Sequence, residues 1–380
     1  MTSLFWVLTA AVVYVYAGYP LLLALMRLLG LARPVASAPI EPSLTLIVSA
    51  FNEQDVIAEK ITNSLALDYP KDRLQLIVVS DASDDRTDAI VAGFASAGVE
   101  LLRMAERGGK TLGLNAAVGR ARGELVVFSD ANAMYRRDAL RMLARNFADP
   151  AVGAAVGEST YTDAEVESER SEGLYWRYET SIKRLESAIG SVVGGDGAIY
   201  AIRRSLYVPM RADALSDFVN PLQIVAAGHR CVYEPAALSY ERAGDDFQKE
   251  FRRKVRIVNR GWRATLGFKR LLNPLRYGLF AFELFSHKLL RWLVPVMLVA
   301  LLPVTAAIAP RAPLYALALL AQLGFYLLAL GGHALRRRAS MPAVLSVPYF
   351  FCLVNIASLL GILDAMRGKT YTTWTTARAK

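Results

Sequence analysis

Long apolar runs near both ends of the chain frame a middle of mixed composition. One run covers residues 4–29, and three more lie at 289–308, 313–332 and 341–363. A helix needs about 20 apolar residues to cross the hydrocarbon core of a bilayer. A buried core helix would explain one such run. Four of them outside a mixed middle predict a multi-pass membrane protein.

The first apolar run is predicted to be an uncleaved anchor. Ala36 and Ala38 form an A-x-A pattern that a signal peptidase accepts. However, no basic residue precedes the run, which is also longer than the apolar core of a signal peptide. Residues 1–31 are therefore expected to be an N-terminal transmembrane anchor. A linker rich in Pro and Ala follows over residues 32–42.

Between the ends, short apolar stretches alternate with amphipathic ones. Period-2 and continuous apolar runs indicate strands, and a 3.6-residue period indicates helices. This pattern predicts strands at 44–49, 74–80, 100–104 and from 125, and helices at 54–67, 87–97 and 112–120. Such alternation is typical of an α/β domain with a mostly parallel sheet and helices on both faces. We expect this domain over residues 43–245.

Polar residues follow where the predicted strands end, in the stretches AFNE, SDASDDRT and SDAN. Ligands bind outside the carboxyl ends of the strands in an open α/β sheet. Acidic side chains gathered there repel one another unless a cation or hydrogen-bond donors compensate. Asp130 and Asn132 offer a carboxylate and an amide oxygen, which a hard divalent cation accepts. The sequence therefore predicts a metal site at this edge.

The segment Gly108-Gly109-Lys110 opens a predicted helix. It can offer backbone amides and one ammonium to a phosphate. It is too short to be a Walker loop, so ATP hydrolysis receives little support.

The net charge of +10 is concentrated in one block between Lys249 and Arg291. The block directly precedes an apolar run, so the positive-inside rule and anionic headgroups explain it. Residues 246–287 are expected to be a basic amphipathic region at the membrane surface, and no motif indicates a nucleic-acid partner. Cys231 and Cys352 fall in different parts of this layout, which argues against a disulfide.

Five motifs occur in an order that resembles the membrane-embedded family 2 glycosyltransferases, related to the polysaccharide synthases. The motifs are VSAFNE (48–53), VVSDASDDRT (78–87), GGKTLGLNAAVGRARGELVVFSDAN (108–132), GGDGAIYAIRR (194–204) and LSDFVNPLQIVAAGHRCVYEP (215–235). Each is weak alone, but together they cover most of the mixed middle. The resemblance implies a GT-A catalytic domain, a Rossmann-like fold with a mostly parallel sheet, flanked by transmembrane helices.

The resemblance also implies roles for matching residues. Asp217 would be the catalytic base, and Asp130, with Asn132, would hold Mg²⁺ or Mn²⁺ at the diphosphate. Asp81 would contact the nucleobase, with Glu53 in the same pocket. The donor site would further include Ala50, Asn52 and Lys110, and the acceptor or diphosphate contacts would be Gly195, Asp196, Arg256, Arg260 and Trp262.

Three positions depart from the family pattern. The D-x-D motif reads Asp130-Ala131-Asn132, which weakens metal binding without removing it, and Ala82 stands where glycine is usual. The Q-x-x-R-W motif of the processive synthases is replaced by VNRGWRAT, in which Gly261 separates the Arg from the Trp. This departure puts long-chain synthesis in doubt.

Ordinary structural roles compete with several of these assignments. Asp81 and Asp217 each precede a helix and could cap it, and Asp196 could be a turn residue. The aromatic residues Tyr175, Trp176 and Tyr178 are typical of helix packing. His287, just before a membrane run, is expected to be interfacial.

The sequence thus predicts an inverting transfer from a nucleotide-sugar donor, a UDP-sugar, to a lipid-linked or glycan acceptor in surface polysaccharide assembly. We expect a multi-pass inner-membrane protein that contacts membrane lipids and has a cytoplasmic catalytic domain. One alternative is a catalytically inactive nucleotide-binding regulator of polysaccharide export or synthesis. A carrier would need ionisable residues within the spans, where the sequence shows few.

The C-terminal region raises a question of topology. Three full spans over residues 288–365 would place the basic tail, residues 366–380, outside the cell, against the positive-inside rule. Either one apolar run is re-entrant or paired within the interface, or the first span is oriented otherwise. We hold the catalytic domain in the cytoplasm, where the nucleotide donor is, and expect the last run to be the exception, with the tail returning to the cytoplasmic face near the active site.

Overall fold

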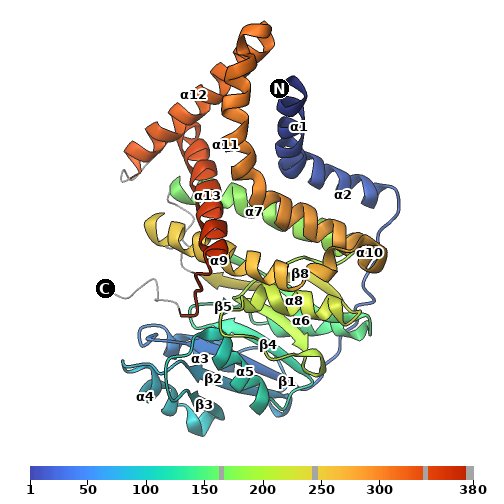
Figure 1. Cartoon of the computed structure of the whole chain (residues 1–380). Helices are drawn as coiled ribbons and strands as arrows, with labels where there is room; N and C mark the ends of the chain where they lie inside the picture. The colour runs from blue at the N-terminus through green and yellow to red at the C-terminus, as the bar shows by residue number, and fades with distance from the viewer. Residues whose placement is uncertain (162–166, 242–246, 337–340, 374–380) are drawn as a thin grey trace. The chain divides into compact units, whose positions relative to one another are not determined.

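The computed structural model describes the chain except for residues 162–166, 242–246, 337–340 and 374–380 (Figure 1). The chain divides into two compact units. The α/β unit comprises Leu31–Thr162, Glu186–Ala243 and Thr370–Lys380. The helical unit comprises Met1–Gly30, Asp163–Leu185 and Gly244–Lys369. Residues 163–185, which the sequence analysis included in the central domain, thus cluster with the helical unit.

In the described residues of the α/β unit, eight strands form one sheet in the order β3-β2-β1-β4-β7-β6-β8-β5. Pairing is parallel among β3, β2, β1 and β4 and between β6 and β8, and antiparallel at the other junctions. This mostly parallel sheet confirms the predicted fold class. The strands are β1 Leu44–Ala50, β2 Leu74–Ser80, β3 Val99–Arg103, β4 Leu125–Asp130, β5 Met134–Tyr135, β6 Val152–Tyr161, β7 Ile199–Arg203 and β8 Arg230–Glu241.

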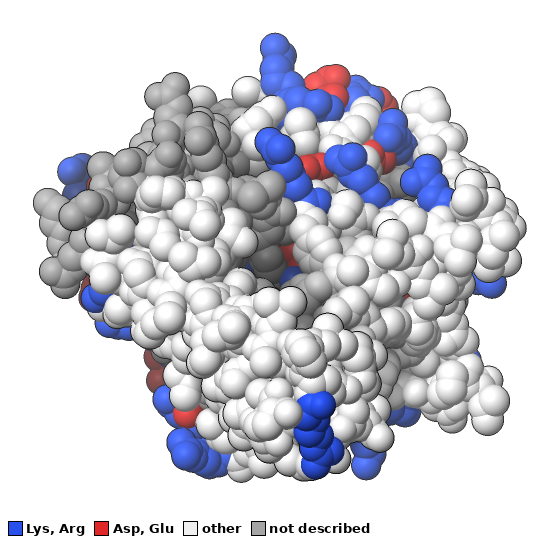
Figure 2. Space-filling model, turned by 90° about the horizontal axis from the view of Figure 1, so that it is seen from above, with Lys and Arg blue, Asp and Glu red and all other residues white. Residues whose placement is uncertain are grey.

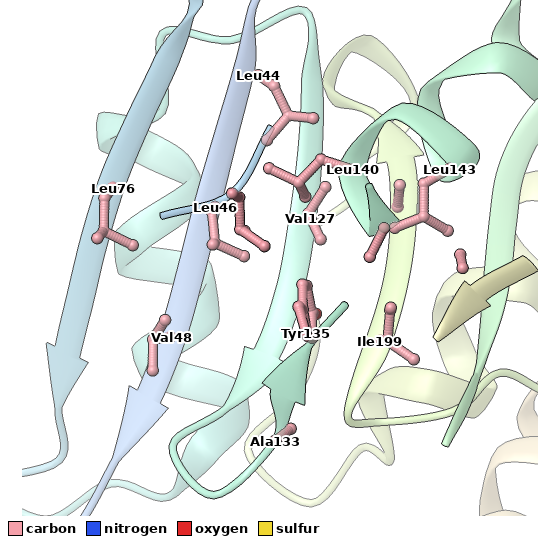
Figure 3. Packing of buried hydrophobic residues seen from close by; sticks show 14 of the residues in the cluster. Leu44, Leu46, Val48, Leu76, Val127, Ala133, Tyr135, Leu140, Leu143 and Ile199 are labelled. Atoms are coloured by element: carbon pink, nitrogen blue, oxygen red, sulfur yellow. The ribbon is translucent and has the colours of Figure 1, made fainter. Parts of the chain in front are cut away.

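Both faces of the sheet are covered, and the alternation of side chains along β1 shows how. Leu44, Leu46 and Val48 point into an apolar cluster shared with helices α3 (Ile57–Leu65) and α6 (Ala139–Ala144), part of which Figure 3 draws. Ile47 points the opposite way, into a second cluster with α5 (Lys110–Arg120) and α8 (Ser216–Ala226). Burial on both faces explains why the parallel strands read as continuous apolar runs.

The early helices begin and end at different residues than the periodicity predicts. Helix α3 starts at Ile57 rather than at residue 54. The backbone amides of Glu53 and Gln54 donate instead to side chains of Thr87 and Asp85. Helix α4 covers only Thr87–Ala92, and a separate 3₁₀ turn follows at Ala95–Ala97. Helix α5 begins two residues earlier than predicted, at Lys110.

In the helical unit, four described helices are long and apolar enough to cross a membrane: Thr2–Leu28, Pro274–Arg311, Pro313–Leu335 and Ala343–Met366. Each overlaps one of the predicted apolar runs. The first two contain π-helical segments at Tyr14–Gly18 and Leu284–Leu290. The helices are α1 Thr2–Val13, α2 Tyr19–Leu28, α7 Glu167–Ile189, α9 Phe247–Gly267, α10 Pro274–Glu283, α11 Arg291–Ile308, α12 Pro313–Leu335 and α13 Ala343–Met366.

Apolar side chains remain exposed along these helices. On α12, Leu314, Leu317, Leu320, Leu327 and Leu330 are each more than half exposed. Figure 2 shows a broad uncharged surface on the face that it draws, with a group of Lys and Arg at the top of the view and others around the remaining edges. An apolar surface of this extent is unfavourable in water and suits contact with lipid.

Tyr178 and His287 have packing roles inside the helical unit. The Tyr178 hydroxyl on α7 donates a hydrogen bond to the carbonyl of Tyr16 at 3.1 Å. His287 is buried, with its Nε2 3.3 Å from Glu179 Oε2, and Glu179 also pairs with Arg291. His287 therefore belongs to a buried polar cluster within the helical unit.

Candidate active site

Strand order places the candidate site at the carboxyl ends of β1, β2 and β4. The chain runs from β1 outward through β2 to β3 and then returns to β4 on the other side of β1. Such a reversal of strand order opens a crevice where ligands bind in open α/β folds. The predicted residues Ala50, Asn52, Glu53, Asp81, Asp130 and Asn132 all lie at this rim.

The loops after β1 and β2 are joined by hydrogen bonds. The Asn52 side chain donates to Asp84 Oδ1 at 2.6 Å and accepts from the Asp84 backbone N–H at 3.1 Å. The backbone N–H of Asn52 donates to Ser83 Oγ at 3.1 Å, and that of Glu53 donates to Thr87 Oγ1 at 2.8 Å. These contacts fix the two loops as one rigid edge.

Backbone strain marks the same edge. Among the described residues, Asn52 and Ala82 are the non-glycine residues with positive φ, at 54° and 55°. The left-handed region costs a residue with a Cβ about 1–2 kcal/mol. The left-handed conformation of Ala82 explains why glycine, which has no Cβ, suits this position. Residues held in such conformations cluster at binding and catalytic sites.

Asp81 is 2% exposed and holds the loop that begins α5. Its Oδ1 accepts from the backbone N–H of Gly108 at 2.8 Å and its Oδ2 from that of Gly109 at 2.9 Å. These amides were predicted to bind a phosphate, but in the structure they bind Asp81 because a buried carboxylate needs donors. Asp81 thus accepts hydrogen bonds from backbone amides at the start of α5, as a helix-capping residue does, and it also lies at the rim of the sheet.

Arg107, which the sequence analysis did not single out, lies beside this loop. Its guanidinium is 3.8 Å from the centre of the Phe51 ring. A cation over an aromatic face is attracted by the ring quadrupole. In the sequence, only its position directly before Gly108-Gly109-Lys110 indicated that Arg107 lies at the site.

The described part of the C-terminal tail packs against the same loop. Gly109 has a φ of +89°, and a Cβ built there would lie 2.2 Å from the carbonyl oxygen of Thr372. Only glycine therefore allows this contact, which lies within the α/β unit.

Lys110 brings the metal motif next to the loop between α7 and β7. Its ammonium pairs with Asp130 Oδ1 and donates to the carbonyl of Gly197 at 3.2 Å. The Asp130 side chain is 37% exposed and so remains accessible to a ligand. The described residues contain no cluster of three or more His, Cys, Asp or Glu side chains that could hold a metal. Asp130 and Asn132 are hard oxygen donors that fit Mg²⁺ or Mn²⁺, but a bound ion would need further oxygens from a substrate.

Asp217 lies near the same glycine that Lys110 approaches. It is the second residue of α8, whose N-cap residue is Leu215, so capping does not explain it. A Cβ on Gly197 would lie 3.4 Å from Asp217 Oδ2 and 3.6 Å from Lys110 Nζ. The backbone N–H of Gly195 donates to the Asp217 carbonyl at 2.6 Å. The structure therefore brings Lys110, Asp130 and Asp217 around one glycine.

Asp196 has a defined role in the turn between these groups. Its Oδ1 accepts from the backbone N–H of Ala198 at 3.1 Å. Its Oδ2 is buried and has no hydrogen-bond partner among the residues that the structure describes. One oxygen thus shapes the turn, and an acceptor contact by the other stays a prediction.

The remaining predicted residues belong to the helical unit. Arg256, Arg260 and Trp262 lie on α9, whereas the other predicted site residues belong to the α/β unit. Gly261 departs from the family pattern for a local reason. A Cβ at this position would lie 2.7 Å from the Trp292 ring, so the packing of α9 requires glycine.

A family comparison agrees with this geometry. Residues 45–207 match the model of glycosyl transferase family 2. The chain carries a glycosyl transferase family 2 domain. The match begins in β1 and ends just after β7, and it includes the rim residues from Asn52 to Gly197.

The chain is also similar to curated proteins, at about a quarter of identical residues. An N-acetylglucosaminyltransferase of Rhizobium meliloti (strain 1021) is 28% identical over 273 residues, covering 67% of this chain and 63% of the relative. A poly-β-1,6-N-acetyl-D-glucosamine synthase of Staphylococcus aureus (strain MW2) is 24% identical, covering 59% of this chain and 55% of the relative. The chain therefore spans less than two thirds of the length of the curated relatives that it matches.

A solved structure resembles the chain over nearly its whole length. The mannosyltransferase PcManGT from Pyrobaculum calidifontis, solved in complex with GDP-Man and Mn²⁺, has a TM-score of 0.72 and 24% identity. The comparison covers 97% of this chain and 99% of that one. The likeness supports the GT-A fold of the family 2 domain together with its membrane-length helices.

Proposed function

We propose that the protein transfers a sugar, with inversion, from a nucleotide-sugar donor to a lipid-linked or glycan acceptor at a membrane. The observation that carries this proposal is the arrangement of Lys110, Asp130 and Asp217 around Gly197, beside the rigid edge that holds Asp81. In this proposal Asp81 contacts the nucleotide, Asp130 binds the cation and Asp217 is the general base, all at one rim of the sheet.

The proposed chemistry follows from these positions. The acceptor hydroxyl attacks the anomeric carbon, the bond from that carbon to the diphosphate oxygen breaks, and Asp217 takes the hydroxyl proton. Lys110 stabilises the negative charge that develops on the leaving diphosphate. A divalent cation held by Asp130 and Asn132 would supply further charge stabilisation there.

The nature of the donor and the location are also proposals. A UDP-sugar is the proposed donor, and UDP-N-acetylglucosamine is the first to test because relatives are named N-acetylglucosaminyltransferase. GDP-mannose belongs in the same screen, since the mannosyltransferase of similar fold was solved with it. The four membrane-length helices and the need for a cytoplasmic donor favour the inner membrane, with the α/β unit in the cytoplasm.

A donor screen tests the proposal. The full chain, purified in detergent with membrane extract as acceptor, is given radiolabelled nucleotide sugars and Mn²⁺ or Mg²⁺. We expect transfer of label to lipid or glycan, and no transfer by the Asp217→Asn variant. Binding of UDP without turnover of any donor would instead support the inactive regulator.

A further inference from the structure

Helix α3 presents two polar side chains to the segment that follows the metal motif. Lys60 is fully buried, its ammonium donates to the carbonyl of Ala133, and it lies 3.9 Å from the centre of the Tyr135 ring. Asn63 lies one turn further along the same helix face. Its Oδ1 accepts from the Tyr135 N–H at 2.8 Å, and its Nδ2 donates to the Tyr135 carbonyl at 2.9 Å.

These contacts hold the backbone directly after Asp130-Ala131-Asn132. Three backbone groups of Ala133 and Tyr135 are bound by two side chains of one helix. The turn that carries the predicted metal donors is therefore held in place from the interior of the domain, by contacts inside the apolar cluster beneath the rim.

Tyr135 extends the same network to the acceptor side of the rim. Its hydroxyl lies 3.1 Å from the Phe128 carbonyl and 2.9 Å from the Ala198 carbonyl. Phe128 lies on β4 two residues before Asp130, and Ala198 directly follows Gly197. Figure 3 shows Tyr135 in the apolar cluster that also contains Ile199. One hydroxyl thus links the strand of the metal motif to the loop that Lys110 and Asp217 approach.

Packing alone does not explain these residues. Burial lowers the pKa of Lys60 to about 7, which shows how unfavourable the charged form is at this position. An apolar side chain of similar volume avoids that cost, because replacing buried ionic groups by packed apolar ones is often neutral or stabilising. Buried polar residues that disfavour stability are expected where function constrains the sequence.

We propose that Lys60, Asn63 and Tyr135 are positioning residues that fix the Asp130-Ala131-Asn132 turn relative to the loop at residues 194–198. The inference rests on the proposed function, since it states how the reacting groups are held for transfer. None of the three need touch substrate. Their effect passes through the backbone of residues 128–135 and of Ala198.

Tyr135→Phe is the sharpest test, because it removes one oxygen and leaves the ring and the Asn63 contacts in place. A misplacement of about 1 Å in an active site costs about 100-fold in rate. We therefore expect kcat to fall by about 10- to 100-fold, while KM for the donor and Kd for UDP stay within about twofold. KM and Kd should change little because Asn52 and Asp81, which are proposed to contact the nucleotide, are held by other hydrogen bonds.

Tyr69→Phe provides a matched control. Tyr69 is a buried tyrosine of the same apolar cluster, and its hydroxyl donates to the Pro42 carbonyl at 2.5 Å. This variant loses a comparable hydrogen bond away from the rim. We expect its Tm to fall about as much as that of Tyr135→Phe and its kcat to remain that of the natural protein.

A second measurement separates this inference from the proposed function. The electron paramagnetic resonance spectrum of Mn²⁺ in the presence of UDP reports the metal surroundings without turnover. We expect an altered spectrum or weaker Mn²⁺ binding in Tyr135→Phe and in Asn63→Leu, but not in Tyr69→Phe. If the natural protein binds Mn²⁺ and UDP but transfers no sugar, the proposed function fails and this spectrum alone decides the inference. A spectrum and a kcat both unchanged in Tyr135→Phe overturn it.

Discussion

The two halves of the rim are built in different ways. The half proposed to bind the donor, called the donor half below, consists of the loops after β1 and β2 and of Gly108-Gly109. It is joined by hydrogen bonds to backbone groups and includes residues with positive φ. The transfer half, formed by Lys110, Asp130, Gly197 and Asp217, is held together by charged side chains near one glycine. Backbone contacts fix a shape for binding, whereas charged side chains can respond to charge that develops during a reaction.

The largest expected effect comes from removing the charge of Asp217 in the transfer half. Asp217→Asn keeps the shape of the side chain but cannot accept the acceptor proton, so kcat should fall by about 10³-fold or more. Nucleotide affinity should stay nearly unchanged, because proton acceptance matters only in the transition state. Turnover assays and UDP titrations measure the two quantities. Near-normal turnover would remove Asp217 from the mechanism.

The metal prediction also concerns the transfer half. Chelator should abolish transfer, Mn²⁺ or Mg²⁺ should restore it, and Asp130→Ala should not be rescued. Asn132→Asp should tighten Mn²⁺ binding by about tenfold, because a carboxylate binds a hard cation better than an amide. Titration of Mn²⁺ in the presence of UDP gives the affinity directly. An unchanged affinity in Asn132→Asp would show that this side chain does not contact the ion.

Substitutions in the donor half should mainly change the affinity for UDP. Gly109→Ala places a Cβ 2.2 Å from the Thr372 carbonyl in a backbone region nearly closed to other residues, which disturbs the Asp81 contacts. UDP affinity should fall by about tenfold, and the Tm should fall as well.

Gly108→Ala is the control for that change. A Cβ at Gly108 would meet the end of the Leu112 side chain at 3.1 Å, a group that can move aside. Its effect on UDP affinity should be within about twofold. Equal effects of the two substitutions would contradict the steric explanation.

The last prediction concerns stability rather than activity, through the pH dependence of the anchor beneath the transfer half. Burial lowers the pKa of Lys60 to about 7, so between pH 7 and the usual lysine pKa the unfolded state binds more protons than the folded state. Stability from this group therefore rises with pH across that window, by on the order of 1 kcal/mol per unit. Lys60→Met lacks this dependence. It should be more stable than the natural protein at pH 7, and thermal unfolding in detergent should show the gap narrowing by pH 9.5.

The first half of the sheet was predictable because its strands are buried on both faces and its helices carry regular apolar stripes. The carboxyl-end loops were predictable for the same reason, since each begins where an apolar run stops. The second half was not, because β5 has only two residues and β6 and β8 pair across a long separation in sequence.

Partners far apart in the chain limited the prediction of the site. Asp81 was found from its motif, but its contacts with Gly108 and Gly109 depend on how a later loop closes. Tyr135 reads as an apolar residue after the metal motif, and nothing local shows that its hydroxyl reaches Ala198. The packing of Trp292 against Gly261 likewise joins residues from two separate helices.

The connectivity of the two units has a practical consequence. The chain passes between them at 30/31, 162/163, 185/186, 243/244 and 369/370, which makes five junctions. A fragment of residues 31–243 would keep every strand of the sheet but carry along residues 163–185, cut off from the remainder of the helical unit. It would also lose Thr372 from its place against Gly109. Purification should therefore start from the full chain in detergent or lipid, because no single continuous segment of the chain contains the α/β unit alone.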